Sequence, residues 1–288
     1  MKTIFISAFS GIEVKNLLRT GVAARLLADP EVQLVLVTTD EPERVAHYRK
    51  EFALPRIIVA PVPRYRAAGA DAFFRALSFL LLRTPTTYWR AGLVGRALRR
   101  PFHAFITRAL HFVLGRKYAI RLARFLDRVL VCRNDYEDLF VKYSPNVIVC
   151  ANLFDEKELH LLREAKRRGV PTVGYINSWD KVTARAVLRD LPDQFIVFNE
   201  TIRGELVVHH AVPRKRIAVC GIPQYDFFFR PNAIAESAAL YGQRIRTLRS
   251  REEFLRALGL GAGERLVCYA PMGARFSECD FDMIDVLC

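Results

Sequence analysis

The chain has 288 residues, of which 51% are hydrophobic and 26% charged, and its formal net charge is +14. This composition excludes a disordered chain and supplies enough apolar side chains for one large domain or two of ordinary size. The six cysteines lack the CxxC spacing of metal sites, and Cys132, Cys150, Cys220 and Cys268 lie in or beside apolar runs, which favours buried free thiols in a reducing cytosol.

The first apolar run, residues 3–9, is too short for a signal peptide and has no A-x-A cleavage site, so it predicts a first strand. Further runs are almost continuously apolar (LVLV, VIVC, FIVF), which is typical of parallel strands covered by helices on both faces. Strands are predicted at 3–8, 32–38, 56–60, 147–151, 172–176, 194–198 and 216–220. Helices are predicted at 14–28, 42–51, 155–168 and 200–209. The alternation predicts an α/β fold with a doubly wound, mostly parallel Rossmann-like sheet.

A strongly basic segment, residues 64–133, interrupts this alternation as a predicted helical insertion. It holds fifteen Lys and Arg residues against Asp71 and Asp127, so it carries +13 of the net charge of +14. Large apolar residues lie among these cations, a composition typical of a surface that binds anionic lipid. Its longest apolar run, 76–82, is far below the ~20 residues of a membrane-spanning helix. We therefore expect peripheral contact with an anionic membrane, with Arg96, Arg99 and Arg100 among the contact residues.

Two other interpretations of the basic segment stay open. A basic patch also suits nucleic acid, but no nucleic-acid-binding module is recognisable, so we expect no nucleic-acid partner. After Gly115, Lys117, Arg121, Arg124 and Arg128 recur at helical spacing opposite Leu122, Phe125, Leu126 and Val129. That pattern also fits an ordinary surface helix, with its arginines in water and its apolar side on a core.

The pattern of apolar and polar residues changes after Asp226. A new strand (265–270) and the start of a helix (281–287) are predicted after a glycine-containing turn. One strand and part of a helix cannot bury their own apolar faces. Either they pair with the first sheet, or they begin a truncated second Rossmann-like domain, which we favour. The predicted organisation is an N-terminal domain over 1–228, a linker over 229–263 and the start of a C-terminal domain over 264–288.

Three strand-end loops carry the candidate site residues, because ligands of open α/β sheets bind at the carboxyl ends of strands. The first loop offers Ser10, Gly11 and Glu13 before a helix N-terminus, where anions are favoured. The second offers Asn177, Ser178, Trp179, Asp180 and Lys181, and the third offers Gly221, Gln224 and Asp226. Each has a structural alternative: a plain turn, loop packing by Trp179, and an inter-domain hinge. No GxSxG nucleophile motif or metal-ligand spacing is present in the sequence.

Four motifs together resemble the GT-B glycosyltransferase superfamily. Within it, they look most like CDP-glycerol glycerophosphotransferases and related surface-polysaccharide transferases, and UDP-N-acetylglucosamine 2-epimerases share the architecture. The motifs are Asn-Ser-Trp-Asp at 177–180, Phe-Ile-Val-Phe-Asn-Glu at 195–200, His-Ala-Val-Pro at 210–213 and Gly-Ile-Pro-Gln-Tyr-Asp at 221–226. The residue after Trp-Asp is often Asn in such relatives, whereas here it is Lys181.

The resemblance implies two Rossmann-like domains around a cleft. The N-terminal domain takes the acceptor, the C-terminal domain binds a CDP- or UDP-linked donor, and no metal or other cofactor is needed. It implies a donor-phosphate loop around Gly273, and a transferase that moves a sugar or polyol phosphate to a lipid-linked or cell-surface polysaccharide acceptor. Glu13 or Asp180 would be the catalytic base. The enzyme would work in the cytoplasm, on the inner face of the membrane. The alternatives are an epimerase of the same architecture and a non-catalytic membrane-binding fragment.

Overall fold

The computed structural model describes residues 1–97, 101–229, 240–241, 250–261, 263–271 and 280–287. Its contacts divide the chain into two compact units, Met1–Ile245 and Arg246–Cys288. The first unit holds the sheet and the basic segment. Among the described residues, the second holds the helices α14 (Arg251–Ala257) and α15 (Asp280–Leu287).

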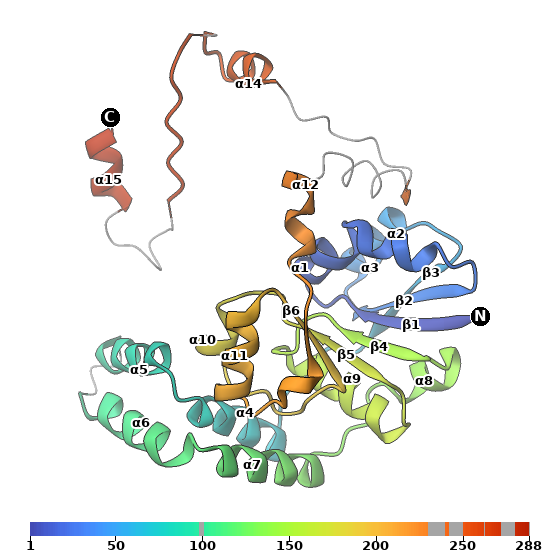
Figure 1. Ribbon diagram of the computed structural model, residues 1–288, viewed down its shortest axis with the longest axis vertical. Helices are drawn as coiled ribbons and strands as arrows, with labels where there is room; N and C mark the ends of the chain where they lie inside the picture. Colours follow the sequence, from blue (N-terminus) through green and yellow to red (C-terminus); the bar gives the residue numbers. More distant parts are fainter. Residues whose placement is uncertain (98–100, 230–239, 242–249, 262, 272–279, 288) are drawn as a thin grey trace. The chain divides into compact units, whose positions relative to one another are not determined.

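The first unit is built on a seven-stranded parallel sheet with the order β3-β2-β1-β4-β5-β6-β7 (Figure 1). The strands are β1 (Lys2–Ser7), β2 (Val32–Thr39), β3 (Ile57–Val62), β4 (Val147–Cys150), β5 (Thr172–Tyr175), β6 (Gln194–Val197) and β7 (Ile217–Val219). Each predicted strand of the first unit forms within two residues of its expected ends. The parallel, doubly wound α/β fold is therefore confirmed. The direction of winding reverses between β1 and β4, and ligands bind at such switch points in open sheets.

Both faces of the sheet are buried. Phe5 and Val35 belong to the apolar core on one face, while their neighbours Ile6 and Leu34 belong to the core on the other. This explains why the strands are continuously apolar rather than alternating. The covering helices include α3 (Pro42–Glu51), α8 (Glu137–Tyr143), α9 (Glu156–Arg167) and α11 (Glu200–His209).

The single helix predicted at 14–28 is wrong. The structure has a short α1 (Gly11–Glu13), a π-helix η1 (Val14–Leu18) and then α2 (Gly21–Leu27). Thr20 has an extended backbone and caps α2, since its hydroxyl accepts a hydrogen bond from the Val22 amide at 3.4 Å. The same hydroxyl donates to the Asn16 carbonyl at 3.0 Å and so ends the preceding turn.

The basic segment is helical, as predicted, and connects β3 to β4. Its helices in the described residues are α4 (Gly69–Leu81), α5 (Pro85–Ala97), α6 (Pro101–Leu114) and α7 (Lys117–Leu130). Within the described residues, we find no helix with the length and apolar character needed to cross a bilayer.

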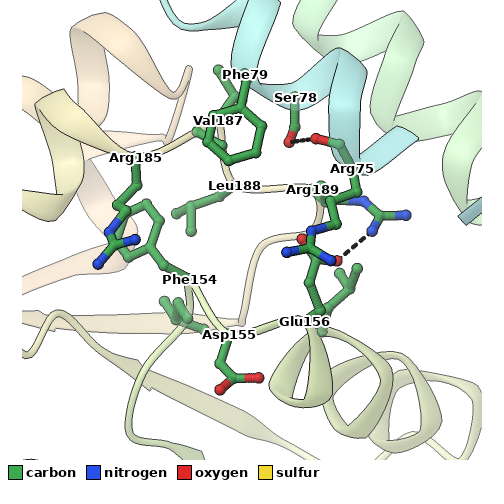
Figure 2. Close-up of a pocket in the computed structure, with 13 residues that line it drawn as sticks. Arg75, Ser78, Phe79, Phe154, Asp155, Glu156, Arg185, Val187, Leu188 and Arg189 are labelled. Carbon is green, nitrogen blue, oxygen red and sulfur yellow. Dashed lines mark hydrogen bonds and ion pairs between the residues drawn. The ribbon is translucent and has the colours of Figure 1, made fainter. Parts of the chain in front are cut away.

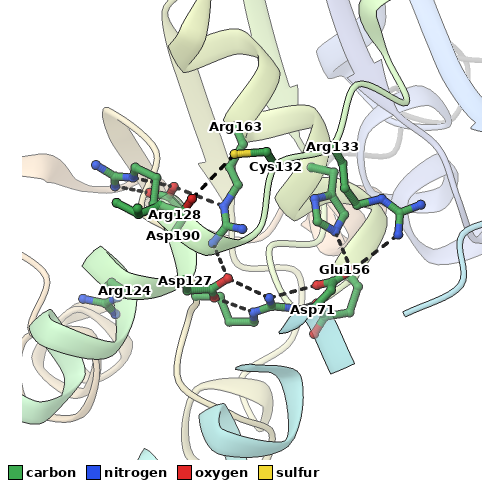
Figure 3. A network of polar contacts seen from close by, with 12 residues as sticks. Asp71, Arg124, Asp127, Arg128, Cys132, Arg133, Glu156, Arg163 and Asp190 are labelled. Atoms are coloured by element: carbon green, nitrogen blue, oxygen red, sulfur yellow. Dashed lines mark hydrogen bonds and ion pairs between the residues drawn. The ribbon is translucent and has the colours of Figure 1, made fainter. Parts of the chain in front are cut away.

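An ion-pair network joins this segment to α9 and to the loop before β6 (Figure 3). We define it as Asp71, Asp127, Arg163, Arg189 and Asp190, which are all nine-tenths or more buried. Asp127 accepts two hydrogen bonds of 2.8 Å from Arg189 and lies 3.0 Å from Arg163. Asp71 lies 2.9 Å from Arg189, and Asp190 is paired with Arg163. The insertion is therefore held by buried charges from α4 and α7.

The orientation of α7 agrees with the surface-helix interpretation only in part: Lys117, Arg121 and Arg128 are exposed, as that interpretation expects, but Arg124 is not. Arg124 is buried and donates to the carbonyls of Leu188 and His210, each at 2.7 Å. The apolar side chains of Phe125 and Val129 are instead 64% and 57% exposed. The buried side of α7 carries Ile120, Arg124 and Asp127, and the polar partners of Arg124 and Asp127 hold that side inward.

The short helix α10 (Lys181–Ala184) is fixed from several sides. The His210 Nε2 atom donates to the Val182 carbonyl at 2.7 Å, and its Nδ1 atom accepts from the Leu188 amide at 3.1 Å. From the insertion, the Thr84 hydroxyl donates to the Thr183 carbonyl at 2.7 Å, and Arg90 donates to the Ala184 carbonyl at 2.8 Å. These partners also require the neutral form of His210.

Burial lowers the pKa of His210 to about 3. The unfolded chain binds a proton on this residue below its ordinary pKa of about 6.5, whereas the folded chain does not. The stabilisation from the neutral His210 is therefore complete above a pH of about 6.5. As the pH decreases below that value, the free energy of unfolding decreases by about 1.4 kcal/mol per pH unit, until the pH approaches the pKa of the folded protein. We expect His210→Gln to flatten the loss of unfolding free energy between about pH 6 and about pH 4. Denaturant unfolding at several pH values checks this, with the exposed His47→Gln as control. A slope that His210→Gln leaves unchanged would contradict the buried neutral imidazole.

Two further expectations are wrong. The described residues 263–271 form no β-ladder, although the sequence predicts a strand at 265–270, because a strand exists only where a neighbour supplies hydrogen bonds. Cys150 is buried as predicted, but Cys132, Cys220 and Cys268 are free and exposed. An apolar neighbourhood in sequence does not determine which side of a strand end or helix a thiol occupies.

Candidate functional site

Polar side chains from three strand ends meet at the switch point. The Lys181 ammonium donates to Asn152 Oδ1 at 3.0 Å and to Asn177 Oδ1 at 2.8 Å. Asn152 Nδ2 in turn donates to Glu13 Oε1 at 3.0 Å. We call these four residues the strand-end cluster. They follow β1, β4 and β5, which are adjacent in the sheet, so the fold brings together residues separated by up to 168 positions.

The β1 loop is shaped to present Glu13. Ser10 caps α1, and its amide donates to Glu13 Oε2 in a capping box. The π-helix that follows puts Asn16 against the second loop, where its Nδ2 lies 3.5 Å from the Asn177 carbonyl. A π-helix is rare and is often found at functional sites.

Burial gives the strand-end cluster unusual electrostatics. Glu13, Asn177 and Lys181 are all nine-tenths or more buried. Burial lowers the pKa of Lys181, and the nearby Glu13 carboxylate opposes that shift. Glu158, also buried, has a pKa well above its ordinary value, first because of burial and then because of the Glu13 charge. A buried ammonium beside a carboxylate is an arrangement that can stabilise a charged ligand electrostatically.

Some buried polar atoms in this region have no hydrogen-bond partner in the described part of the protein. Among the residues that the structure describes, Asn177 Nδ2, Glu158 Oε1 and Asn16 Oδ1 have no hydrogen-bond partner. Buried polar atoms in proteins are nearly always paired, so unpaired atoms here mark a region where polar ligand or solvent contacts are favourable.

The other predicted residues of the first two loops lie outside the strand-end cluster. Ser10 and Gly11 start α1, and Gly11 is exposed. Ser178 donates to the Asp180 carboxylate at the start of α10, and Asp180 is exposed. Trp179 is 73% exposed, so it does not pack the loop into the core.

The third loop reaches the same edge of the sheet. Gly221 has φ +82°, a left-handed conformation that favours glycine, and the chain then turns into the 3-10 helix η3 (Pro223–Tyr225). This turn lies against η1, which follows Glu13. Gln224 and Asp226 are half-buried beside it.

Several predicted residues cannot be located. Arg99, Arg100 and Gly273 lie outside the described residues, and Arg96 lies in α5 with its side chain outside them. Conversely, the sequence reasoning missed Asn152 and Glu158. Asn152 directly follows the strand predicted at 147–151, so the strand-end rule that selected Asn177 would also have selected it.

A cavity of about 120 Å³ is lined in part by residues that follow Asn152 and Lys181 in the sequence (Figure 2). It is lined by Arg75 and Phe79 of α4, by the turn 153–156 after β4, and by residues 185–189 after α10. Arg185 is close enough to Lys181 that its charge contributes to the lowered Lys181 pKa. The cavity therefore lies between the insertion and the segments that follow β4 and α10, and it combines aromatic, cationic and carboxylate side chains.

No protein-family model matches the chain, and a search of curated proteins finds no match. Similar solved structures include the lipopolysaccharide outer core galactosyltransferase WaaB in its apo form, with 12% identity and a TM-score of 0.35 over 76% of this chain and 45% of that one. UDP-GlcNAc 2-epimerase from Neisseria meningitidis, bound to UDP-GlcNAc, has 10% identity and a TM-score of 0.38 over 80% and 49%. Arabidopsis thaliana UGT89C1 complexed with UDP has 8% identity and a TM-score of 0.32 over 77% and 49%.

The chain spans about half the length of these structures. The strand order and parallel register identify the fold class without these neighbours.

Proposed function

We propose that the chain is the acceptor-binding half of a GT-B-type transferase. Such an enzyme would move a sugar or polyol phosphate from a CDP- or UDP-linked donor to a lipid-linked or cell-surface polysaccharide acceptor. The observation that carries the proposal is the strand-end cluster, with its buried Lys181 ammonium, at the switch point of a parallel sheet. The same fold supports many chemistries, so the fold does not identify the substrate. The buried Lys181 ammonium is what supports a negatively charged donor as the substrate.

The two carboxylates predicted as base differ in access. Glu13 is 1% exposed and is engaged by Ser10 and Asn152, whereas Asp180 is exposed beside Lys181. A general base must come within hydrogen-bond reach of the acceptor hydroxyl. This difference supports Asp180 as the base and Glu13 as the residue that positions Asn152 and Lys181.

The remaining contacts follow from the positions of the loops. The acceptor would occupy the cavity beside Arg75 and Phe79. The donor would be held by a second Rossmann-like lobe to which residues 264–288 would contribute, with Gly273 in a donor-phosphate loop. No cofactor beyond the nucleotide-activated donor is proposed. The reaction would take place on the cytoplasmic face of the membrane, where Arg96, Arg99 and Arg100 would contact anionic lipid.

A donor screen tests the proposal. The protein, with any further lobe that its gene encodes, is incubated with radiolabelled CDP-glycerol, UDP-glucose or UDP-N-acetylglucosamine, together with a membrane lipid extract or a cell-wall polysaccharide fraction. We expect label to move into one acceptor fraction from one of these donors. Acceptor-independent formation of UDP-N-acetylmannosamine would instead identify an epimerase. Release of no product from any donor would contradict the transferase proposal.

A further inference from the structure

The outward face of α7 is apolar although the helix has many charges. Its exposed apolar side chains include Leu122, Phe125, Val129 and Leu130, which are 57% to 64% exposed. The opposite face carries Arg124 and Asp127, which are buried among polar partners. This orientation is fixed, because turning the helix would separate Asp127 from Arg189 and Arg163 and leave buried charges unpaired.

The preceding helix has the same character. In α6, the side chains of Phe102, Phe105, Ile106, Phe112 and Val113 are each more than half exposed. Both α6 and α7 pack against α4 and follow one another along one edge of the first unit (Figure 1). We call the exposed apolar side chains of these two helices the α6–α7 apolar face. Exposed apolar surface of this extent on a folded protein marks an interaction site.

The charges around this face identify its partner. Asp127 is the one acidic residue in the sequence between positions 72 and 134, and it is buried. The exposed charges on α6 and α7 and on the turn between them are therefore cations, including Arg108, Arg116, Lys117 and Arg121. A second copy of the chain would bring these cations against one another, which is unfavourable. Nucleic acid would use the cations but leave the aromatic side chains in water.

We propose that the α6–α7 apolar face lies in the headgroup region of an anionic bilayer. Its apolar side chains would enter the acyl boundary while the surrounding cations contact lipid phosphates. This geometry fits helices that are amphipathic but too short to span. It differs from the contact predicted through Arg96, Arg99 and Arg100, and it does not depend on any transfer reaction.

The test is sedimentation with vesicles of phosphatidylcholine, with or without phosphatidylglycerol. The chain is expected to sediment with the anionic vesicles only. Val129→Asp is expected to weaken this binding roughly tenfold or more, because it places a carboxylate at the acyl boundary. Val208→Asp is the matched control, since Val208 is 58% exposed on α11 and Val129 is 57% exposed on α7. Arg121→Glu should weaken binding roughly fivefold or more, while the exposed Arg25→Glu should not.

Thermal melts of the four variants show whether folding is intact, and since all four side chains are exposed we expect the melting temperatures to be unchanged. Equal binding by Val129→Asp and Val208→Asp would overturn the proposal, as would failure of the unmodified chain to bind anionic vesicles. Lipid-free self-association that Val129→Asp abolishes would assign the face to a second copy and likewise overturn it. None of these readouts needs donor or acceptor, so they are separate from the test of the transferase.

Discussion

Asp127→Ala is expected to lower the free energy of unfolding by about 3–5 kcal/mol. The carboxylate is 2% exposed and pairs with Arg189 and Arg163, which are themselves buried. Its removal leaves guanidinium groups inside the protein without their counter-charge, which costs far more than losing a hydrogen bond at the surface. Since domains are stable by only about 5–15 kcal/mol, the first unit should unfold at a much lower denaturant concentration.

Denaturant unfolding followed by circular dichroism measures this effect, and Asp135→Ala is the control. Asp135 also pairs with an arginine, Arg133 at 2.7 Å, but its side chain is 37% exposed. An exposed pair contributes at most about 1 kcal/mol. If the two variants unfolded at the same midpoint, the Asp127 pairs would not be holding the insertion in place.

The second large effect is expected at Lys181. Lys181→Met keeps the length of the side chain but removes the ammonium that bridges Asn152 and Asn177. If this charge stabilises the departing nucleotide phosphates, transfer should slow by roughly 100-fold or more, as when other preorganised donors are removed. The loss should fall on kcat more than on KM, because the charge on the leaving group develops in the transition state.

Steady-state kinetics with the donor found in the screen measure this, with the exposed Lys142→Met as control. A melting curve separates loss of function from loss of structure. Lys181→Met with unchanged kcat and an intact fold would exclude Lys181 from the reaction.

The sheet was predictable because its signal is local. Continuous apolar runs such as those of β2 and β4 predict the strands of the sheet, and helices with clear ends, such as α3 and α11, were predicted to the residue. The break at Thr20 was not predicted, because it depends on one hydroxyl serving two backbone groups.

The site was predictable only in part. Glu13, Asn177 and Lys181 were selected because they follow strands, and the structure brings them together. Their connection through Asn152 was not visible, because it depends on the order in which the strands lie in the sheet. For α7, spacing predicts an amphipathic helix but not which face is buried. That choice depends on Arg189 and Arg163, which lie far along the sequence.

The contacts between the insertion and α10 determine which shortened forms of this protein can keep the site. The turn that carries Lys181 is anchored by Thr84 and Arg90 as well as by His210, so the sheet by itself does not determine where the ammonium lies. A shortened chain that lacked residues 64–133 would lose the contacts of Thr84 and Arg90 with α10, and Arg189 would lose Asp71 and Asp127 as partners. The Lys181 ammonium would then be held less firmly near Asn152. A minimal core that ended at the strand boundaries would therefore lack contacts that position this group.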